Sequence, residues 1–181
     1  MATYIALLRG INVSGQRKIK MDELKILFES LYFKNVRTYI QSGNVVFEDG
    51  ETDSGLLGKI IEDKILKDLG LEVYVIIRNQ VQLKAIHRDN PFMTSGNSEI
   101  SARYVTFLSD YPNDTFLDRI KEVCYTPDEF SFIGREVYLF CPNGYGRTKL
   151  NNSFFENKLK LKATTRNWKT INELNEMVDL N

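Results

Sequence analysis

The fold is decided by residues 36–47, Val36-Arg37-Thr38-Tyr39-Ile40-Gln41-Ser42-Gly43-Asn44-Val45-Val46-Phe47. Residues 36–40 and 45–47 are short apolar-rich runs typical of strands. The residues between them, Gln41-Ser42-Gly43-Asn44, are typical of a tight hairpin turn, in which we expect Gly43 and Asn44 to supply the positive φ angles. The sequence therefore predicts a β-hairpin at this position.

The hairpin is flanked on each side by the patterns of one helix and one further strand. Upstream lie an apolar run at residues 4–8 and a helical spacing of apolar residues over 21–31. Downstream, a second helix fits residues 54–68 and ends at Gly70, and another strand fits residues 72–77. The order βαββαβ is that of the ferredoxin-like unit, an antiparallel sheet with two helices on one face.

The same order of elements restarts after a stretch rich in Ser, Gly and Asn at residues 90–98. A linking helix is predicted before it, over residues 79–88. Beyond it the patterns predict strands over 102–108, 129–133, 136–140 and 163–165, helices over 114–124 and 153–160, and a final helix over 168–178.

We therefore expect an α+β protein of two tandem ferredoxin-like βαββαβ units with antiparallel sheets and an extra C-terminal helix. The first unit, with the linking helix, would span residues 1–90, and the second, with the C-terminal helix, residues 98–181. Each unit is small for an independent core. We expect the two to pack against each other and to leave a cleft, which is a favoured position for a ligand.

Charge is balanced over the whole chain, with 24 Lys and Arg against 24 Asp and Glu in 181 residues. Proteins that coat nucleic acid nonspecifically usually carry a large basic excess, because phosphate contacts supply most of their affinity. A general polyanion coat is therefore excluded, and an anion site must be a local patch. The apolar runs are too short to span a bilayer, and no secretory signal is evident, so we expect no membrane association.

The two cysteines and the single histidine limit metal chemistry. Cys124 and Cys141 form no zinc-binding pattern, and His87 alone cannot build a His-rich site. No flanking feature predicts a lowered thiol pKa for either cysteine. We expect a cytoplasmic protein with reduced thiols, no metal and no cofactor. The triplet His87-Arg88-Asp89 matches a kinase catalytic triplet, but no DFG follows it, so we interpret it as a coincidence.

Four segments carry a resemblance to a known family. They are Leu8-Arg9-Gly10-Ile11-Asn12-Val13, Thr38-Tyr39-Ile40-Gln41-Ser42-Gly43-Asn44-Val45, Gly144-Tyr145-Gly146 and Ala163-Thr164-Thr165-Arg166-Asn167-Trp168. Their ordered combination resembles the bacterial domain-of-unknown-function family 1697 over nearly the whole chain. The resemblance implies a tandem ferredoxin-like fold and a soluble bacterial protein, and it implies no established activity. Family members commonly have Gly-Gly-Lys-Asn where this chain has Ser14-Gly15-Gln16-Arg17. If the family lysine has a ligand role, that role is missing here or is taken over by Arg17 or Lys18.

The loop after the first strand is the first candidate anion site. Residues 10–15 have the Gly spacing of a P-loop, but Gln16 and Arg17 stand where a P-loop has Lys and Ser or Thr, which excludes a Walker nucleotide site. Four cations and no acid remain between residues 9 and 20. The loop is therefore either an anion cradle, with Arg9 and Asn12 as contacts, or a solvated surface loop.

The hairpin turn is a second candidate. Gln41, Ser42 and Asn44 place neutral donors and acceptors at one end of the sheet, although turn formation alone explains these residue types. An RRM-type RNA site is excluded, because the third strand offers Asn44 and Val46 where stacking aromatics are required.

The strongest local charge lies in residues 145–170, which hold seven cations and one acid, Glu156. The cations are Arg147, Lys149, Lys158, Lys160, Lys162, Arg166 and Lys169. Thr165, Arg166 and Asn167 precede the final helix, whose first N–H groups can bind a phosphate or carboxylate together with the arginine. Alternatively, Thr165 or Asn167 only caps the helix and Arg166 pairs with a surface acid.

The favoured function is binding of a phosphate-bearing small ligand, nucleotide or RNA end at a basic cleft between the units. The alternatives are an enzyme acting on a small anionic substrate and a scaffold with no small-molecule site. No oligomeric state is indicated. The candidate contacts are Arg9, Asn12, Gln41, Ser42, Asn44, Arg147, Lys149, Thr165, Arg166 and Asn167.

Overall fold

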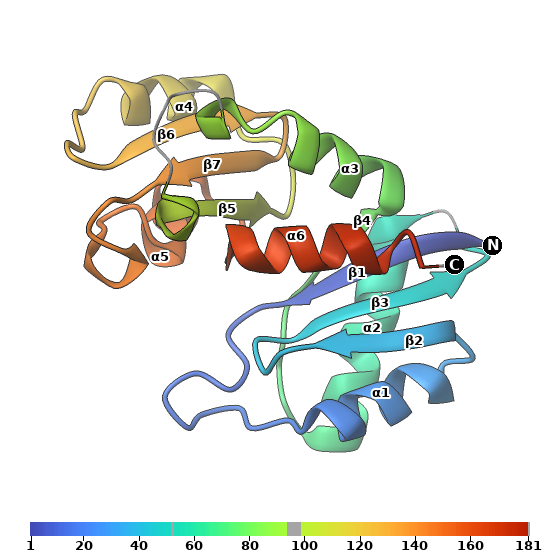
Figure 1. Ribbon diagram of the computed structural model, residues 1–181. Helices are drawn as coiled ribbons and strands as arrows, with labels where there is room; N and C mark the ends of the chain where they lie inside the picture. The colour runs from blue at the N-terminus through green and yellow to red at the C-terminus, as the bar shows by residue number, and fades with distance from the viewer. Residues whose placement is uncertain (52, 94–98, 181) are drawn as a thin grey trace. The chain divides into compact units, whose positions relative to one another are not determined.

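The computed structural model describes residues 1–51, 53–93 and 99–180 (Figure 1). The chain divides into two compact units. The first comprises Met1–Ala85 together with the residues from Leu174 onward, and the second comprises Ile86–Glu173. The boundary predicted at residues 90–98 stays a prediction, because residues 94–98 lie outside the described residues.

The first unit is a four-stranded antiparallel sheet in the order β2-β3-β1-β4. Its elements are β1 (Ala2–Leu8), α1 (Met21–Ser30), β2 (Lys34–Tyr39), β3 (Asn44–Asp49), α2 (Ser54–Leu69) and β4 (Val75–Asn79). The predicted βαββαβ order is confirmed. The fourth strand begins at Val75 rather than at residue 72, because its partner β1 ends at Leu8, which pairs with Val75.

The second unit repeats this topology with the sheet order β6-β7-β5-β8, again antiparallel. Its elements are β5 (Arg103–Leu108), α4 (Asp114–Lys121), β6 (Glu129–Ile133), β7 (Glu136–Phe140), α5 (Asn152–Leu159) and β8 (Ala163–Asn167), with short 3₁₀ turns at Pro91–Met93, Ile100–Ala102 and Tyr145–Arg147. The expected α+β fold of two tandem ferredoxin-like units is therefore confirmed.

Two helices complete the chain: α3 (Gln80–Arg88), which connects the sheets in sequence, and the C-terminal α6 (Trp168–Met177). The Nε2 of Gln80 donates to the carbonyl oxygen of Val178 (2.8 Å). Lys84 forms an ion pair with Asp179. These contacts explain why the chain's last residues group with the first unit.

Strand β1 of the first sheet is buried on both faces over residues 4–8. Ala6 and Leu8 of β1 belong to the core formed with helices α1 and α2, while Ile5 and Leu7, which point to the opposite face, are at most 1 % exposed. Strands buried on both faces lose the alternation of apolar and polar residues and become continuous apolar runs. This burial accounts for the uninterrupted apolar stretch at residues 4–8.

Candidate functional site

The four motif segments meet in two pairs, and each pair lies within one unit. In the first unit, the N–H of Leu8 donates to the carbonyl oxygen of Gly43 (2.9 Å), and the Nδ2 of Asn12 donates to that of Gln41 (2.8 Å). In the second unit, the hydroxyl of Tyr145 donates to the Oγ1 of Thr165 (3.0 Å). The motifs therefore join two loops in the first unit, and a 3₁₀ turn to strand β8 in the second.

Asn12 holds the loop after β1 closed. Its φ of 55° is left-handed, its Nδ2 donates to the carbonyl oxygen of Ile19 as well as to that of Gln41, and its Oδ1 accepts the N–H of Ile19. The amide thus ties both ends of the loop together and fixes them to the hairpin. This role explains the residue without a ligand, and contact of Asn12 or Gln41 with an anion stays a prediction.

The hairpin loop is Ile40–Gly43, because Tyr39 already pairs with Asn44. Positive φ angles occur at Gly43 (77°) and Ile40 (48°). The expectation that Asn44 supplies one was wrong, since Asn44 is the first residue of β3. Its buried side chain donates from Nδ2 to the carbonyl oxygen of Tyr39 and to the Oγ of Ser42.

The basic loop folds on itself as a tight turn. Ser14 and Gly15 both have positive φ (50° and 75°), as the two central residues of a mirror-image hairpin turn do. The N–H of Gln16 donates to the carbonyl oxygen of Val13, and that of Asn12 to the carbonyl oxygen of Arg17. These two N–H groups are bonded within the turn, and the side chains of Arg17 and Lys18 are exposed on the loop. An anion cradle at this loop stays a prediction.

Arg9 follows β1 directly and is half-buried, with its N–H donating to the carbonyl oxygen of Tyr74 (2.9 Å). It lies in the first unit, as do Asn12 and the hairpin residues, whereas Arg147, Lys149 and Arg166 lie in the second. A site shared by these two groups stays a prediction.

Arg166 is a buried strand residue. It is 6 % exposed, and its Nη1 donates to the Oγ1 of Thr164 (2.8 Å) and to the carbonyl oxygen of Thr165 (3.0 Å). Burial lowers the pKa of its guanidinium to about 10, which still leaves it charged at neutral pH. The cap of α6 is Asn167, whose Oδ1 accepts the N–H of Thr170 (2.8 Å).

Thr165 takes part in a polar network on the helix-covered face of the second sheet. Its Oγ1 lies 2.7 Å from the Oγ1 of Thr106 and donates to the Oδ1 of Asn152 (2.7 Å), while Tyr145 donates to it. The N–H of Asn152 donates in turn to the hydroxyl of Tyr145 (3.2 Å). Burial raises the pKa of that phenol, and each group has a partner, so the network is structural.

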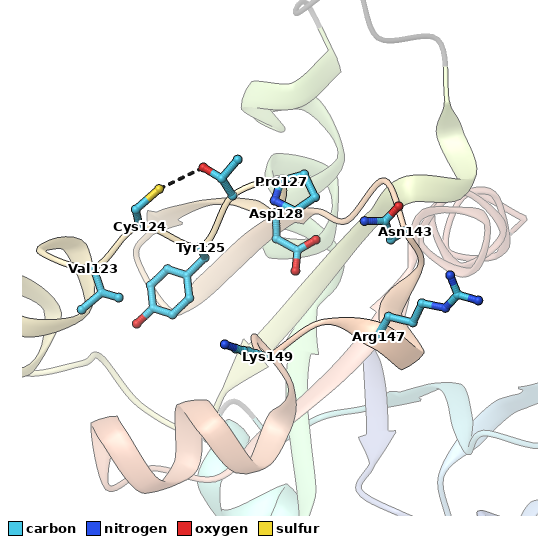
Figure 2. A pocket seen from close by; sticks show the side chains of 9 residues that line it. Val123, Cys124, Tyr125, Pro127, Asp128, Asn143, Arg147 and Lys149 are labelled. Atoms are coloured by element: carbon cyan, nitrogen blue, oxygen red, sulfur yellow. Dashed lines mark hydrogen bonds between the residues drawn. The ribbon is translucent and has the colours of Figure 1, made fainter.

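The second unit contains a cavity of about 460 Å³, the Arg147 pocket (Figure 2). Figure 2 shows that its labelled side chains come from two stretches of chain, residues 123–128 after α4 and residues 143–149 after β7. Its lining consists of Val123, Cys124, Tyr125, Thr126, Pro127, Asp128, Asn143, Arg147 and Lys149. Two of the cations singled out from the sequence thus share one cavity.

Two cations and one carboxylate are among the described side chains that line the Arg147 pocket. Arg147 and Lys149 are exposed, whereas the carboxylate of Asp128 accepts a hydrogen bond from the Oγ1 of Thr148 (2.6 Å). That same Oγ1 accepts the N–H of Leu150 (3.0 Å). The Asp128–Thr148 bond thus joins the two stretches that line the cavity, and the two cations remain at its surface.

The surroundings of Cys124 differ from what the sequence predicts for its thiol pKa. Its Sγ lies 2.9 Å from the Oγ1 of Thr126, and hydrogen bonds from the Thr126 side chain and backbone lower the pKa of this exposed thiol. The expectation that nothing nearby lowers a thiol pKa was therefore wrong for Cys124. For Cys141, burial raises the pKa to about 11.

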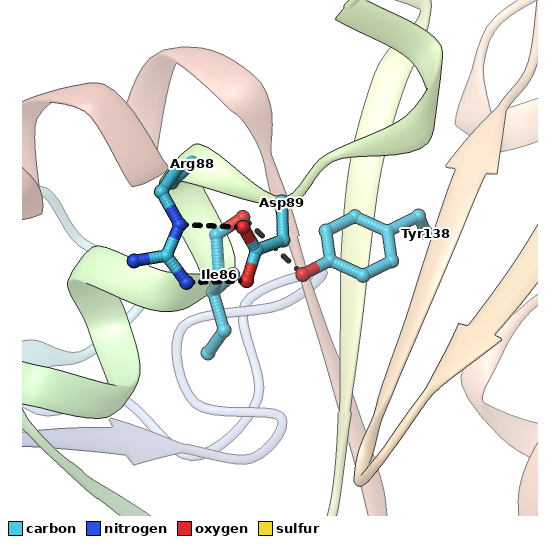
Figure 3. Close-up of polar contacts among 4 residues, drawn as sticks. All are labelled: Ile86, Arg88, Asp89 and Tyr138. Carbon is cyan, nitrogen blue, oxygen red and sulfur yellow. Dashed lines mark hydrogen bonds and ion pairs between the residues drawn. The ribbon is translucent and has the colours of Figure 1, made fainter.

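In the triplet His87-Arg88-Asp89, His87 and Arg88 end helix α3, and the side chains of Arg88 and Asp89 are exposed. The Nε and Nη2 of Arg88 donate to the two carboxylate oxygens of Asp89 (2.6 and 2.8 Å), as Figure 3 shows. The hydroxyl of Tyr138 donates to the carbonyl oxygen of Ile86 (3.2 Å). Pairing with the guanidinium lowers the pKa of Asp89, which makes it a poor general base. We therefore keep the interpretation that the match to a kinase catalytic triplet is a coincidence.

The described part of the chain comprises residues 1–51, 53–93 and 99–180. Within this part of the chain, no three His, Cys, Asp or Glu side chains converge closely enough to hold a metal ion. No helix there has both the length and the apolar character needed to cross a bilayer.

These features define the class: an α+β protein of two tandem ferredoxin-like units whose signature motifs fasten the loops of each unit. The chain belongs to the family described as Protein of unknown function (DUF1697), whose family model matches residues 1–138. Its fold is similar to that of the conserved bacterial protein SP0830 from Streptococcus pneumoniae, with a TM-score of 0.76 and 20 % sequence identity over 98 % of each chain. No curated protein matches the sequence.

Proposed function

We propose that the protein binds a phosphate-bearing small ligand in the Arg147 pocket, with a nucleotide and an RNA 5′ end as two sources of the same phosphate chemistry. The observation that carries this proposal is the presence of two exposed cations, Arg147 and Lys149, on one cavity of about 460 Å³. The only carboxylate among the described side chains that line it is that of Asp128, which already accepts a hydrogen bond from Thr148.

The size and chemistry of the pocket support this ligand class. Small-molecule sites are commonly clefts of about 300–1,000 Å³ with a few polar groups that fix orientation. The planar guanidinium of Arg147 suits two phosphate oxygens at once, and the ammonium of Lys149 adds a second positive charge. Both cations are exposed, so we expect affinity to fall as salt is added.

The wider version of this hypothesis is one basic cleft that also uses Arg9, Asn12 and Arg166. It is a separate proposal, and the Arg147 pocket does not depend on it. We also propose a cytoplasmic location, which the free thiols of Cys124 and Cys141 support, because reducing compartments keep cysteines unpaired.

The test compares two double variants that each remove two exposed positive charges. Arg147→Gln with Lys149→Gln alters the pocket, whereas Lys158→Gln with Lys162→Gln alters cations of the same basic stretch that do not line it. Binding of ATP, inorganic phosphate and a 5′-phosphorylated RNA oligonucleotide is measured by calorimetry at two salt concentrations.

We expect the wild type and the control variant to bind at least one of these probes equally well. The pocket variant loses about tenfold or more, because a hydrogen bond to a charged group contributes about 1.5–3 kcal/mol. Tighter binding of RNA than of ATP identifies the RNA end as the source. Equal affinity of the two variants, or no binding by the wild type, contradicts the proposal.

A further inference from the structure

A second cavity, the Lys169 pocket, lies in the second unit and has a volume of about 430 Å³. It is lined by Ile100, Ser101, Tyr104, Asn167, Lys169 and Asn172. None of these residues lines the Arg147 pocket. The two cavities are therefore separate sites, although the basic stretch of residues 145–170 contributes a lysine to each.

The polar lining of the Lys169 pocket offers donors from Lys169 and from the two carboxamides of Asn167 and Asn172. The Oδ1 of Asn167 already accepts the N–H of Thr170 (2.8 Å), and the Oδ1 of Asn172 lies within hydrogen-bond distance of the Nε2 of His87 (3.1 Å). Each carboxamide oxygen thus has a partner within the protein, and the Nδ2 is the group of each side chain that we assign to a ligand. Lys169 adds one exposed positive charge, and none of the described lining side chains is a carboxylate.

The remaining lining is apolar. Ile100 is 51 % exposed, and Tyr104 contributes a ring whose centroid lies 5.2 Å from that of Tyr145. Covering the Ile100 side chain removes apolar surface from water, which is favourable. An aromatic ring is the group that best covers a neighbouring aliphatic and aromatic side chain together.

We propose that the Lys169 pocket binds a small aromatic carboxylate. The carboxylate accepts hydrogen bonds from Lys169 and from the Nδ2 groups of Asn167 and Asn172, and the ring lies against Ile100 and Tyr104. A single lysine balances the single negative charge of a carboxylate, whereas the two cations of the Arg147 pocket suit the higher charge of a phosphate. This inference goes beyond the function proposed above and does not rest on it.

Trp168 provides a reporter for this site, because it is the single tryptophan of the chain and lies between Asn167 and Lys169. Its buried ring stacks on His87 with a centroid distance of 5.4 Å, and His87 contacts Asn172. Titration with benzoate, followed by tryptophan fluorescence, is expected to give a saturable change with a Kd on the order of 1 mM, as suits so small a ligand.

Three comparison probes separate the parts of the proposed ligand. Acetate has the charge without the ring, benzamide has the ring without the charge, and inorganic phosphate tests whether any anion suffices. We expect each to bind about tenfold more weakly than benzoate. Binding of benzamide or acetate as tight as that of benzoate overturns the proposal, as does the lack of a saturable response to benzoate.

Two variants test the named contacts. Lys169→Gln removes the charge and is expected to weaken benzoate binding about tenfold. Asn167→Asp preserves the helix cap, because Asp caps as well as Asn, but it places a negative charge beside the carboxylate and should abolish binding without a loss in melting temperature. The control Lys158→Gln should bind benzoate like the wild type. Unchanged benzoate affinity in both pocket variants refutes the assignment.

The variants Lys169→Gln and Asn167→Asp should bind ATP and phosphate as the wild type does, since neither residue lines the Arg147 pocket. Failure of the phosphate titrations therefore leaves the benzoate result intact, and failure of the benzoate titrations leaves the phosphate result intact.

Discussion

Replacement of Gly43 by Ala tests how tightly the first pair of motifs is packed. Gly43 has a φ of 77°, in the left-handed region, and its carbonyl oxygen accepts the N–H of Leu8. A Cβ at this position would lie 2.6 Å from the Cδ1 of Ile11, 2.9 Å from its Cγ1 and 2.9 Å from the Cβ of Leu8. Leu8 and Ile11 are both buried, so neither side chain has open space into which to move.

The expected loss of stability has two parts. A left-handed conformation costs a residue with a Cβ about 1–2 kcal/mol. Overpacking a core site costs a further 1–3 kcal/mol or so. Gly43→Ala should therefore lower the free energy of unfolding by about 2–5 kcal/mol, a large part of the total stability of a small domain.

Gly70→Ala is the matched control. Gly70 also has a left-handed φ, of 66°, but a Cβ there would meet no heavy atom within 4 Å. It should lose only the conformational part, about 1–2 kcal/mol. Urea unfolding followed by far-UV circular dichroism measures both variants. Equal losses in the two would refute the inference that the packing of Ile11 and Leu8 against the hairpin makes Gly43 necessary.

Three further predictions concern the side chains of Asn12, Tyr145 and Cys124, whose hydrogen bonds are described above. Asn12→Ala removes the bonds that close the basic loop and should cost about 1–3 kcal/mol in urea unfolding; an unchanged midpoint would contradict its structural role. Tyr145→Phe leaves the polar network without its phenol and should cost about the same, whereas a neutral effect would show that the network adjusts. At neutral pH, iodoacetamide should alkylate Cys124 and spare Cys141, because one thiol pKa is lowered by hydrogen bonds and the other is raised by burial. In Thr126→Val the thiolate loses a donor, so the pH of half-maximal alkylation of Cys124, read by mass spectrometry, should rise; no rise would exclude the hydroxyl as the cause.

The order of elements could be predicted because apolar spacing and turn residues are local properties of the chain. Residues 21–31 and 54–68 repeat apolar positions at helical intervals, and the hairpin at 40–43 contains the glycine that its geometry requires. Element ends were less predictable. The start of β4 is set by the end of β1, a partner nearly seventy residues away in the sequence, and no local pattern around residue 72 contains that information.

The candidate site was predicted less well, because summed charge ignores the direction of side chains. Within β8, Thr165 and Arg166 are neighbours in sequence but point to opposite faces of the sheet. Arg166 is buried on its face, whereas Lys169, three residues on, is exposed and lines a cavity. The stretch 123–128 could not be connected with Arg147 from the sequence, because a bond between Asp128 and Thr148 brings the two segments together.

The number of hydrogen bonds that a candidate residue makes within the protein decides whether its substitution can report on function. The motif residues Asn12, Asn44 and Thr165 hold loops and strands through several hydrogen bonds each. Their loss perturbs folding whether or not a ligand exists, so a loss of binding in such variants is uninformative. Arg147 and Lys169 are exposed cations, each on the lining of one cavity. Substitutions at these two residues are therefore expected to leave the fold intact, and they test the two proposed sites separately.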